Sequence, residues 1–236
     1  MRVLVVRPEG DARRTGAQLA AEGHTAVVAP ILRIEPTGEG PPPGTFDAVA
    51  ITSANAVPAL ASIREGIAAM PLYAVGQRTA AAIREAGLGQ ARSNASDAAE
   101  LANIIAAETR PGGIVLHVAG RDRKEEPANT LARRGFDVVV WATYAAVAVP
   151  VLPEAASAAF AASAVDAAVH YSRRTTGLLM ALAAEAGHLP ALLHLRHVCI
   201  SEDAGAPLRA AGARRLIVAA RPDDDSVVAA LRSAAP

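Results

Sequence analysis

Residues 46–60 read FDAVAITSANAVPAL, and the fold is decided by the pattern in this stretch. Its first half, 46–52, is a short apolar run without polar alternation, which is typical of a strand in a parallel sheet covered on both faces. Its second half has apolar residues at helical spacing, and it begins after Thr52 and Ser53, whose hydroxyls are of the type that caps helices. A buried strand that leads directly into a helix is half of a right-handed βαβ unit.

The same alternation continues on both sides of this stretch. Further strands are predicted at 2–6, 25–29, 71–75, 113–118, 136–141, 165–171, 196–200 and 214–219, and helices at 11–22, 54–64, 77–86, 97–108, 124–134, 173–186, 203–211 and 224–233. Regular alternation of this kind predicts an α/β fold built on doubly wound parallel sheets.

The chain also resembles itself in three places. The paired segments are 46–60 with 165–179, 72–88 with 197–213, and 2–28 with 114–140. The first pairing aligns Asp47 with Asp166 and Ser53 with Ser172. We interpret the three pairings as two related halves, each a small α/β unit.

Two proline-bearing stretches suggest where the halves join. Residues 35–44 (EPTGEGPPPG) and 145–154 (AAVAVPVLPE) have little helix or strand periodicity, as is usual for linkers. Cutting there predicts two flavodoxin-like lobes joined by a two-stranded waist, with the ligand cleft between them. The predicted parts are an outer domain of 1–34 plus 148–236, an inserted domain of 37–143, and linkers at about 35–36 and 144–147.

Composition excludes several classes of protein. The net charge is zero and aromatic residues make up 3%, which argues against a nucleic-acid surface. No run reaches the roughly 18 apolar residues of a membrane span, and no secretion signal is recognisable, so a cytoplasmic protein is expected. A single cysteine, Cys199, excludes an internal disulfide and any multi-cysteine metal site. Dinucleotide and phosphate-loop motifs are also missing.

The candidate binding residues follow predicted strands, because ligands of parallel sheets bind beyond the carboxyl ends of the strands. Hydroxyls, helix-start amides, glycine and arginine gather at these ends, a combination suited to anions. A serine at such a place is most often only a helix N-cap, and a glycine there is often only a turn. The candidates are Arg7, Thr52, Ser53, Asn55, Gly76, Thr79, Tyr171, Ser172 and Ser201.

One further candidate, Tyr144, ends the run FDVVVWATY at the predicted waist. A phenol there is able to donate a proton or a hydrogen bond to a ligand. A lone tyrosine beside Trp141 is more often a packing residue, and the sequence leaves both readings open.

Taken in order, these motifs resemble the uroporphyrinogen-III synthases across nearly the whole chain. The motifs are LVVRP, FDAVAITSANAV, YAVGQRTAAAIREAG, LHVAGRDR, FDVVVWATY, VHYSRRT and CISEDAGAPLRAAG. The resemblance implies a bilobal fold, a lyase that needs no cofactor and no metal, and a linear tetrapyrrole polycarboxylate, hydroxymethylbilane, as substrate. It implies loss of the terminal hydroxyl, attack through the substituted carbon of ring D, a spiro intermediate and ring closure.

The resemblance also implies residue roles. Tyr144 matches the tyrosine that assists departure of the hydroxyl. Thr52, Ser53 and Thr79 match substrate contacts of the inserted domain, while Ser172 and Arg7 match contacts of the outer domain. Many relatives have a glycine-containing turn and a threonine where this chain has residues 200–206 (ISEDAGA), so Ser201 is expected to replace that contact.

Two alternatives to the synthase stay open on the residues alone. The first is a non-catalytic bilobal module that binds a small anion, and the second is a transferase acting on a sugar phosphate. No strongly activated catalytic pair is visible, which favours the binding module, whereas Tyr144 at the predicted waist favours an enzyme. The expected protein acts as a monomer without nucleic-acid or membrane partners.

Overall fold

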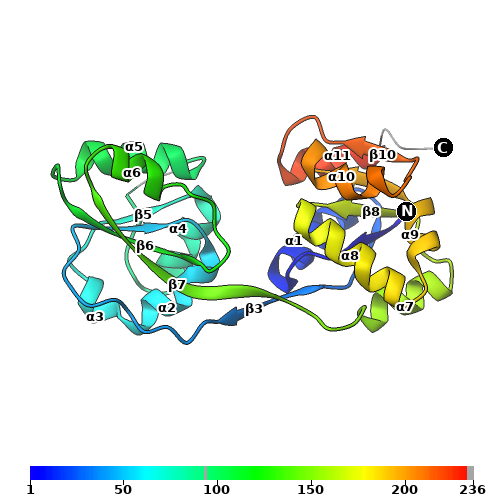
Figure 1. Ribbon diagram of the computed structural model, residues 1–236, viewed down its shortest axis with the longest axis horizontal. Helices are drawn as coiled ribbons and strands as arrows, with labels where there is room; N and C mark the ends of the chain where they lie inside the picture. Colours follow the sequence, from blue (N-terminus) through cyan, green and yellow to red (C-terminus); the bar gives the residue numbers. More distant parts are fainter. Residues whose placement is uncertain (93–94, 233–236) are drawn as a thin grey trace. The chain divides into compact units, whose positions relative to one another are not determined.

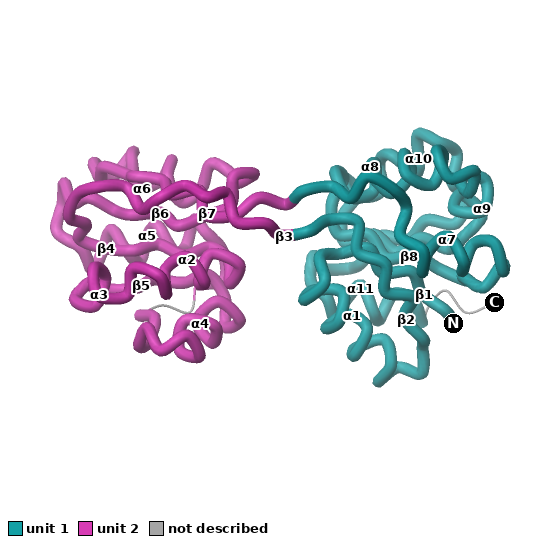
Figure 2. The backbone as a smooth tube through the Cα atoms, turned by 90° about the horizontal axis from the view of Figure 1, so that it is seen from below, with its two compact units in different colours: residues 1–33, 147–236 teal, residues 34–146 magenta. Residues whose placement is uncertain are grey.

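The computed structural model describes residues 1–92 and 95–232 and divides into two compact units (Figures 1 and 2). Unit 1 comprises Met1–Arg33 with Val147–Pro236, and unit 2 comprises Ile34–Ala146. The chain therefore passes from one unit to the other twice, and unit 2 is a continuous insertion in unit 1. The bounds expected from the sequence were 1–34 plus 148–236, and 37–143.

Unit 1 is a five-stranded parallel sheet with helices on both faces. Its strand order is β10-β9-β8-β1-β2. Numbered within the unit this order is 5-4-3-1-2, the order of flavodoxin-like doubly wound sheets. Its elements are β1 (Arg2–Val5), α1 (Glu9–Ala21), β2 (Thr25–Val28), α7 (Glu154–Ala161), β8 (Ala167–His170), α8 (Arg173–Glu185), α9 (Leu189–His194), β9 (Arg196–Cys199), α10 (Glu202–Ala210), β10 (Leu216–Val218) and α11 (Asp224–Arg232).

Unit 2 has a second five-stranded sheet, in the order β3-β7-β6-β4-β5. Strands β4 to β7 are parallel, and their order β7-β6-β4-β5 corresponds to the order β9-β8-β1-β2 of unit 1. Its elements are β3 (Leu32–Pro36), β4 (Ala48–Ile51), a 3₁₀ turn (Ala54–Ala56), α2 (Val57–Ser62), α3 (Arg64–Ile67), β5 (Leu72–Ala74), α4 (Gly76–Glu85), α5 (Ala98–Glu108), β6 (Ile114–Gly120), α6 (Ala128–Arg133) and β7 (Asp137–Ala148).

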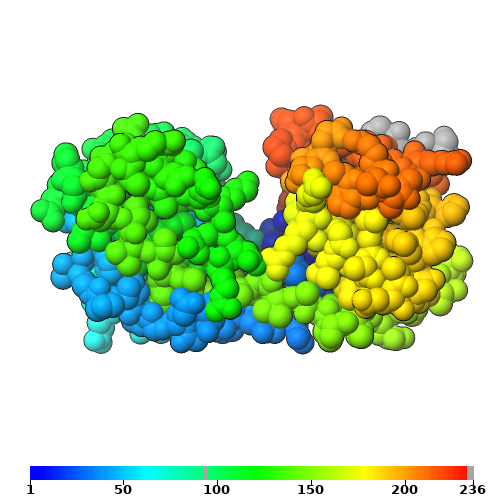
Figure 3. Space-filling model, in the orientation of Figure 1, coloured from blue at the N-terminus to red at the C-terminus, as the bar shows by residue number. Residues whose placement is uncertain are grey.

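The continuous apolar strands divide their side chains between two cores. In β1, Leu4 packs with α7, α8 and α9, whereas Val3 and Val5 pack with α1 and α11. Atoms coloured yellow to orange, the part of the chain that includes α8, α9 and α10, make up much of the face of unit 1 turned to the viewer in Figure 3. In unit 2, Val49 packs with α2 and α4, and Ala50 packs with α5. Both faces of each sheet are thus buried, as predicted from strands without polar alternation. Among the described residues no helix is both long and apolar enough to cross a membrane.

The self-resemblance of the chain does not mark equivalent positions in the two sheets. Strand β4 is the second strand from its edge, beside β5, whereas its sequence match β8 is the central strand of its sheet. The match has a local cause instead. Asp47 accepts a hydrogen bond from the Ile114 amide at 2.8 Å, and Asp166 accepts one from the Arg2 amide at 2.6 Å. Each carboxylate caps the first residue of the neighbouring strand, so similar sequences serve similar strand starts.

One predicted strand end was wrong. The strand expected at 136–141 continues through Ala148. Residues 144–147 and 35–36, expected as linkers that form the two strands of a waist, lie inside β7 and β3. Pairing with β3 and β6 extends β7, and Pro150 follows it. Helices α7 and α9 were not predicted, because the first is an alanine-rich segment with little amphipathic pattern and the second is only six residues long.

Candidate functional site

The predicted site residues of unit 2 lie at the carboxyl ends of its parallel strands. Thr52 follows β4, Gly76 follows β5 after one residue, and Tyr144 lies on β7 opposite Gly120, the last residue of β6. Because the strands are parallel and adjacent, their carboxyl ends form one edge of the sheet. The residues therefore share this edge, where ligands of doubly wound sheets bind.

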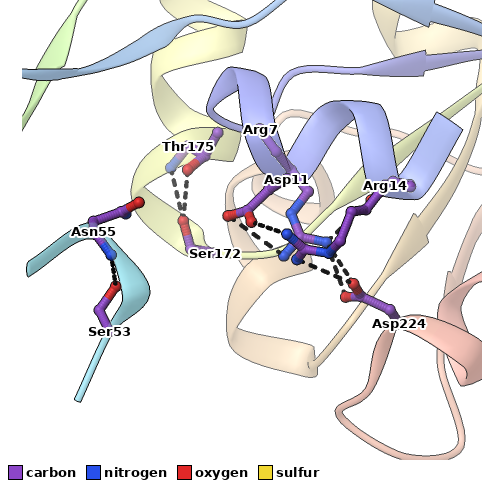
Figure 4. Close-up of polar contacts among 9 residues, drawn as sticks. Arg7, Asp11, Arg14, Ser53, Asn55, Ser172, Thr175 and Asp224 are labelled. Carbon is purple, nitrogen blue, oxygen red and sulfur yellow. Dashed lines mark hydrogen bonds and ion pairs between the residues drawn. The ribbon is translucent and has the colours of Figure 1, made fainter. Parts of the chain in front are cut away.

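The segment after β4 offers two hydroxyls in different settings. The Ser53 hydroxyl caps the following turn and accepts a hydrogen bond from the backbone N–H of Asn55 at 3.2 Å (Figure 4). Thr52 Oγ1 lies 3.3 Å from Nε2 of His117, a buried residue of β6. Ser53 is thus an N-cap, as the simpler reading of the sequence held, and Thr52 has a partner that the sequence did not reveal.

The segment after β5 is shaped by Gly76. Its backbone has φ +73°, a left-handed conformation that suits glycine, and its N–H donates to the carbonyl of Ala95 at 2.8 Å. It is the first residue of α4. Thr79, one turn later, is only 4% exposed, so little of it is accessible from the surface of unit 2.

The ring of Tyr144 packs directly on the backbone of Gly120. A Cβ atom at position 120 would lie 2.9 Å from two ring carbons and 3.1 Å from the hydroxyl. The register of β6 and β7 shifts between Ala119 and Gly120, a bulge of the kind that re-aims side chains beside functional sites. The half-buried Tyr144 hydroxyl has no hydrogen bond to residues 1–92 or 95–232, so it is available to a ligand.

In unit 1 the predicted serines begin two helices at the corresponding edge. Ser172 Oγ accepts from the Thr175 N–H at 3.1 Å, at the start of α8 (Figure 4). Ser201 Oγ accepts from the Ala204 N–H at 3.2 Å, at the start of α10. Both hydroxyls are therefore helix caps, and Ser172 Oγ also lies 2.7 Å from Thr175 Oγ1, a contact in which either hydroxyl is able to donate.

Arg7 lies at the same edge but is already paired. Its guanidinium contacts both oxygens of Asp224, at 2.9 and 3.0 Å, and lies 3.8 Å from Asp11 (Figure 4). It also stacks on the Tyr171 ring, with 3.8 Å between the guanidinium carbon and the ring centroid. Burial raises the pKa of Tyr171, so this phenol stays protonated at neutral pH. A ligand carboxylate at Arg7 would have to compete with two aspartates.

Two acidic residues, Glu202 and Asp203, lie in the first turn of α10 beside Ser201, where their negative charge opposes an anionic ligand. Glu202 forms an ion pair with Arg209, and Asp203 forms one with Arg173 at 3.2 Å. All four side chains are exposed, so each pair weakens but does not remove the local negative charge.

Buried histidines lie next to the strand-end residues of both units, His117 in unit 2 and His170 and His197 in unit 1. None of them was predicted as a site residue. In unit 1, His170 Nε2 and His197 Nδ1 lie 3.0 Å apart, and His170 Nδ1 lies 3.3 Å from the Thr176 hydroxyl. Burial lowers the pKa of His170 to about 3 and that of His197 to about 4. Both are neutral at pH 7. A histidine in an otherwise apolar strand was the one available signal.

The described residues contain no group of three or more His, Cys, Asp or Glu side chains arranged for a metal. Cys199 is buried, and burial raises the pKa of its thiol to about 12, so it is not a nucleophile at neutral pH. The two edges instead present neutral hydrogen-bond donors, which suit binding and orientation of an anionic ligand.

Comparison with known proteins identifies the family. Residues 13–229 match the family model described as uroporphyrinogen-III synthase HemD. The chain resembles the crystal structure of uroporphyrinogen-III synthetase from Helicobacter pylori 26695, with a TM-score of 0.63, 14% identity, and coverage of 88% of this chain and 92% of that one. It also resembles a mutant uroporphyrinogen III synthase from Thermus thermophilus, with a TM-score of 0.52, 20% identity, and coverage of 99% and 98%. Among curated proteins, no sequence matches significantly. The structural likenesses show the fold, and the family match confirms the resemblance found in the sequence.

Proposed function

The chain belongs to the uroporphyrinogen-III synthase family, and from this we propose that it cyclises hydroxymethylbilane to uroporphyrinogen III with inversion of ring D. The observation that carries the proposal is the family match over residues 13–229. Its reaction is that of a cyclising lyase of porphyrin biosynthesis. Its net result is loss of one water, made from the terminal hydroxyl and one proton of the substrate.

The substrate supplies most of the reactivity in this proposal. The C–O bond of the hydroxymethyl group breaks to leave an azafulvene, and the substituted carbon of ring D attacks it to form a spiro centre. One bond of that centre then breaks, the inverted ring rejoins, and a ring-carbon proton leaves at closure. The work of the protein is to hold the chain so that the substituted carbon is the one that attacks.

We assign the acid role to Tyr144. Its hydroxyl is free of partners among the described residues, and its ring is set against Gly120 at the carboxyl edge of unit 2. The phenol O–H is a hydrogen-bond donor, so the side chain is able to donate to the departing hydroxyl. The ring-carbon proton that leaves at closure replaces the proton that Tyr144 donated.

We assign binding of the substrate carboxylates to the strand-end residues of both units. Ser53, Ser172 and Ser201 support this because each begins a helix or turn whose amides favour negative charge. The other members of the set are Arg7, Thr52, Asn55, Gly76, Thr79 and Tyr171. For Arg7 a substrate carboxylate has to compete with Asp224, because Asp224 already forms an ion pair with its guanidinium.

The remaining parts of the proposal concern the whole chain. We propose that the two compact units are the outer and inserted domains of the family, with β3 and β7 as the two strands between them. We also propose a monomer that acts in the cytoplasm. Sedimentation at working concentration tests the monomer, and a single species of about twice the mass of 24.1 kDa contradicts it.

An isomer assay tests the function. Hydroxymethylbilane is generated with and without the purified protein, the products are oxidised, and type I and type III uroporphyrins are separated. Type III product in proportion to protein is the expected result. Type I product alone, at the rate of the protein-free control, would mean that this chain binds anions without catalysing the cyclisation.

A further inference from the structure

His117 lies directly behind Thr52 because of the register of two strands. Ala50 of β4 is opposite His117 of β6, and Thr52 follows Ala50 by two residues, on the same face. The small side chain of Ala50 leaves room for the imidazole to reach along the strand. Nε2 therefore comes to lie 3.3 Å from Thr52 Oγ1.

The two ring nitrogens of His117 have unequal surroundings. The residue is 1% exposed, and its Nδ1 is buried without a hydrogen-bond partner among the described residues. Burial, with a smaller effect from the positive charge of Arg123, lowers the pKa of His117 to about 4, so the ring carries one proton at neutral pH. A buried N–H without an acceptor is rarer in proteins than an unused lone pair. The proton therefore belongs on Nε2, and Thr52 Oγ1 accepts a hydrogen bond from the Nε2–H.

That assignment decides what Thr52 is able to do. A threonine hydroxyl that accepts from His117 still has its own proton, and Thr52 is only half-buried, at the end of β4. If the imidazole proton were on Nδ1, the Thr52 hydroxyl would have to donate inward and would present only lone pairs to a ligand. Lone pairs repel a carboxylate, whereas an O–H binds it.

We propose that His117 is a positioning residue that holds the Thr52 hydroxyl with its proton directed to a carboxylate of the substrate. The inference rests on the proposed function for the identity of the ligand, and on the geometry of β4 and β6 for the direction of the hydrogen bond.

Two substitutions of His117 form a matched pair. The amide nitrogen of glutamine in His117→Gln takes the place of Nε2 and is able to donate to Thr52, while the shorter amide of His117→Asn takes the place of Nδ1 and does not reach it. We expect His117→Asn to raise KM for hydroxymethylbilane about tenfold with kcat nearly unchanged, and His117→Gln to restore most of the affinity. Thr52→Val should raise KM similarly, and adding His117→Asn to it should have no further effect.

Several results would overturn the inference. Equal KM values for the glutamine and asparagine variants would do so, as would a further loss of about tenfold when His117→Asn is added to Thr52→Val. Thermal melting of all variants separates a folding defect from a loss of positioning.

A second measurement needs no activity. Long-range proton–nitrogen NMR of the unliganded wild-type protein, with the His117 signals identified by their loss in His117→Gln, is expected to show the proton on Nε2. A proton on Nδ1 would refute the inference even in a fully active enzyme. Absence of type III product from the wild type would instead refute the proposed function, and the spectrum would still decide how His117 holds Thr52.

Discussion

Alanine at position 120 is expected to displace the phenol of Tyr144, the proposed acid, without altering any polar group. The added Cβ would stand 2.9 Å from two ring carbons of Tyr144. Carbon atoms in contact prefer about 3.5–4.0 Å, so the ring has to move by roughly 0.6–1.1 Å. A misplacement of about 1 Å costs on the order of a hundredfold in rate when the moved group takes part in the reaction. We therefore expect Gly120→Ala to lower kcat by about ten- to a hundredfold.

The same crowding also affects folding, so stability must be measured alongside the isomer assay. Overpacking by one methyl group costs about 1–3 kcal/mol, which a denaturant titration resolves. Gly205→Ala is a matched control, because its Cβ would meet Cys199 and Leu216 at 3.1 Å in the core of unit 1. That variant should lose comparable stability and keep the wild-type kcat.

A double-mutant cycle separates displacement of the ring from other effects. In a Tyr144→Ala background no ring remains to be displaced, and Gly120→Ala should have no further effect on kcat. Displacement of the Tyr144 ring is ruled out as the cause if Gly120→Ala keeps the wild-type kcat, or if it lowers kcat equally with and without the tyrosine ring.

The site supports three further predictions. Tyr144→Phe should slow type III formation by about a hundredfold at unchanged stability, and unchanged turnover would remove Tyr144 from the mechanism. Asp224→Asn frees Arg7 from its nearest carboxylate and should lower KM about two- to fivefold, whereas an unchanged KM would show that Arg7 does not bind substrate. The pKa values of His170 and His197 lie below the unfolded value near 6.5, at about 3 and about 4, so their stabilisation is complete above pH 6.5 and is lost as pH falls toward 3. Urea titrations should show a loss of about 2 kcal/mol per histidine between pH 7.5 and pH 5, and a flat profile would contradict their burial as neutral groups.

The strand and helix pattern was predictable because burial on both faces leaves a direct mark on composition. The run 46–52 is mostly apolar, and its residues Ala48–Ile51 form the parallel strand β4. The ends of β3 and β7 were not predictable, because strands are extended by pairing with neighbours that the local sequence does not name. The self-resemblance does not align the two sheets for a related reason. Asp47 and Asp166 mark the start of a strand and not the place of that strand in its sheet.

The candidate site divides in the same way. Serines after strands were correctly placed as helix starts, because the cap is a local interaction of two or three residues. The contact between Gly120 and Tyr144 depends on a register shift between two strands, and the contact between Thr52 and His117 depends on the register of another pair. Neither is written in the spacing of the residues along the chain.

The insertion of unit 2 has a consequence for the order in which the chain folds. The central pairing of β1 with β8 joins residues 164 positions apart, as in the hydrogen bond from Arg2 to Asp166. Unit 2 is continuous, and its own ends are close, since the Thr37 N–H donates to the Thr143 carbonyl at 3.1 Å. Once unit 2 has folded, the loop between β1 and β8 shortens to roughly 50 flexible residues, which lowers the entropy cost of closing it by about 1 kcal/mol. A folded unit 2 thus holds the two segments of unit 1 close together. During synthesis on the ribosome, unit 2 is complete before strands β8, β9 and β10 of unit 1 have been made.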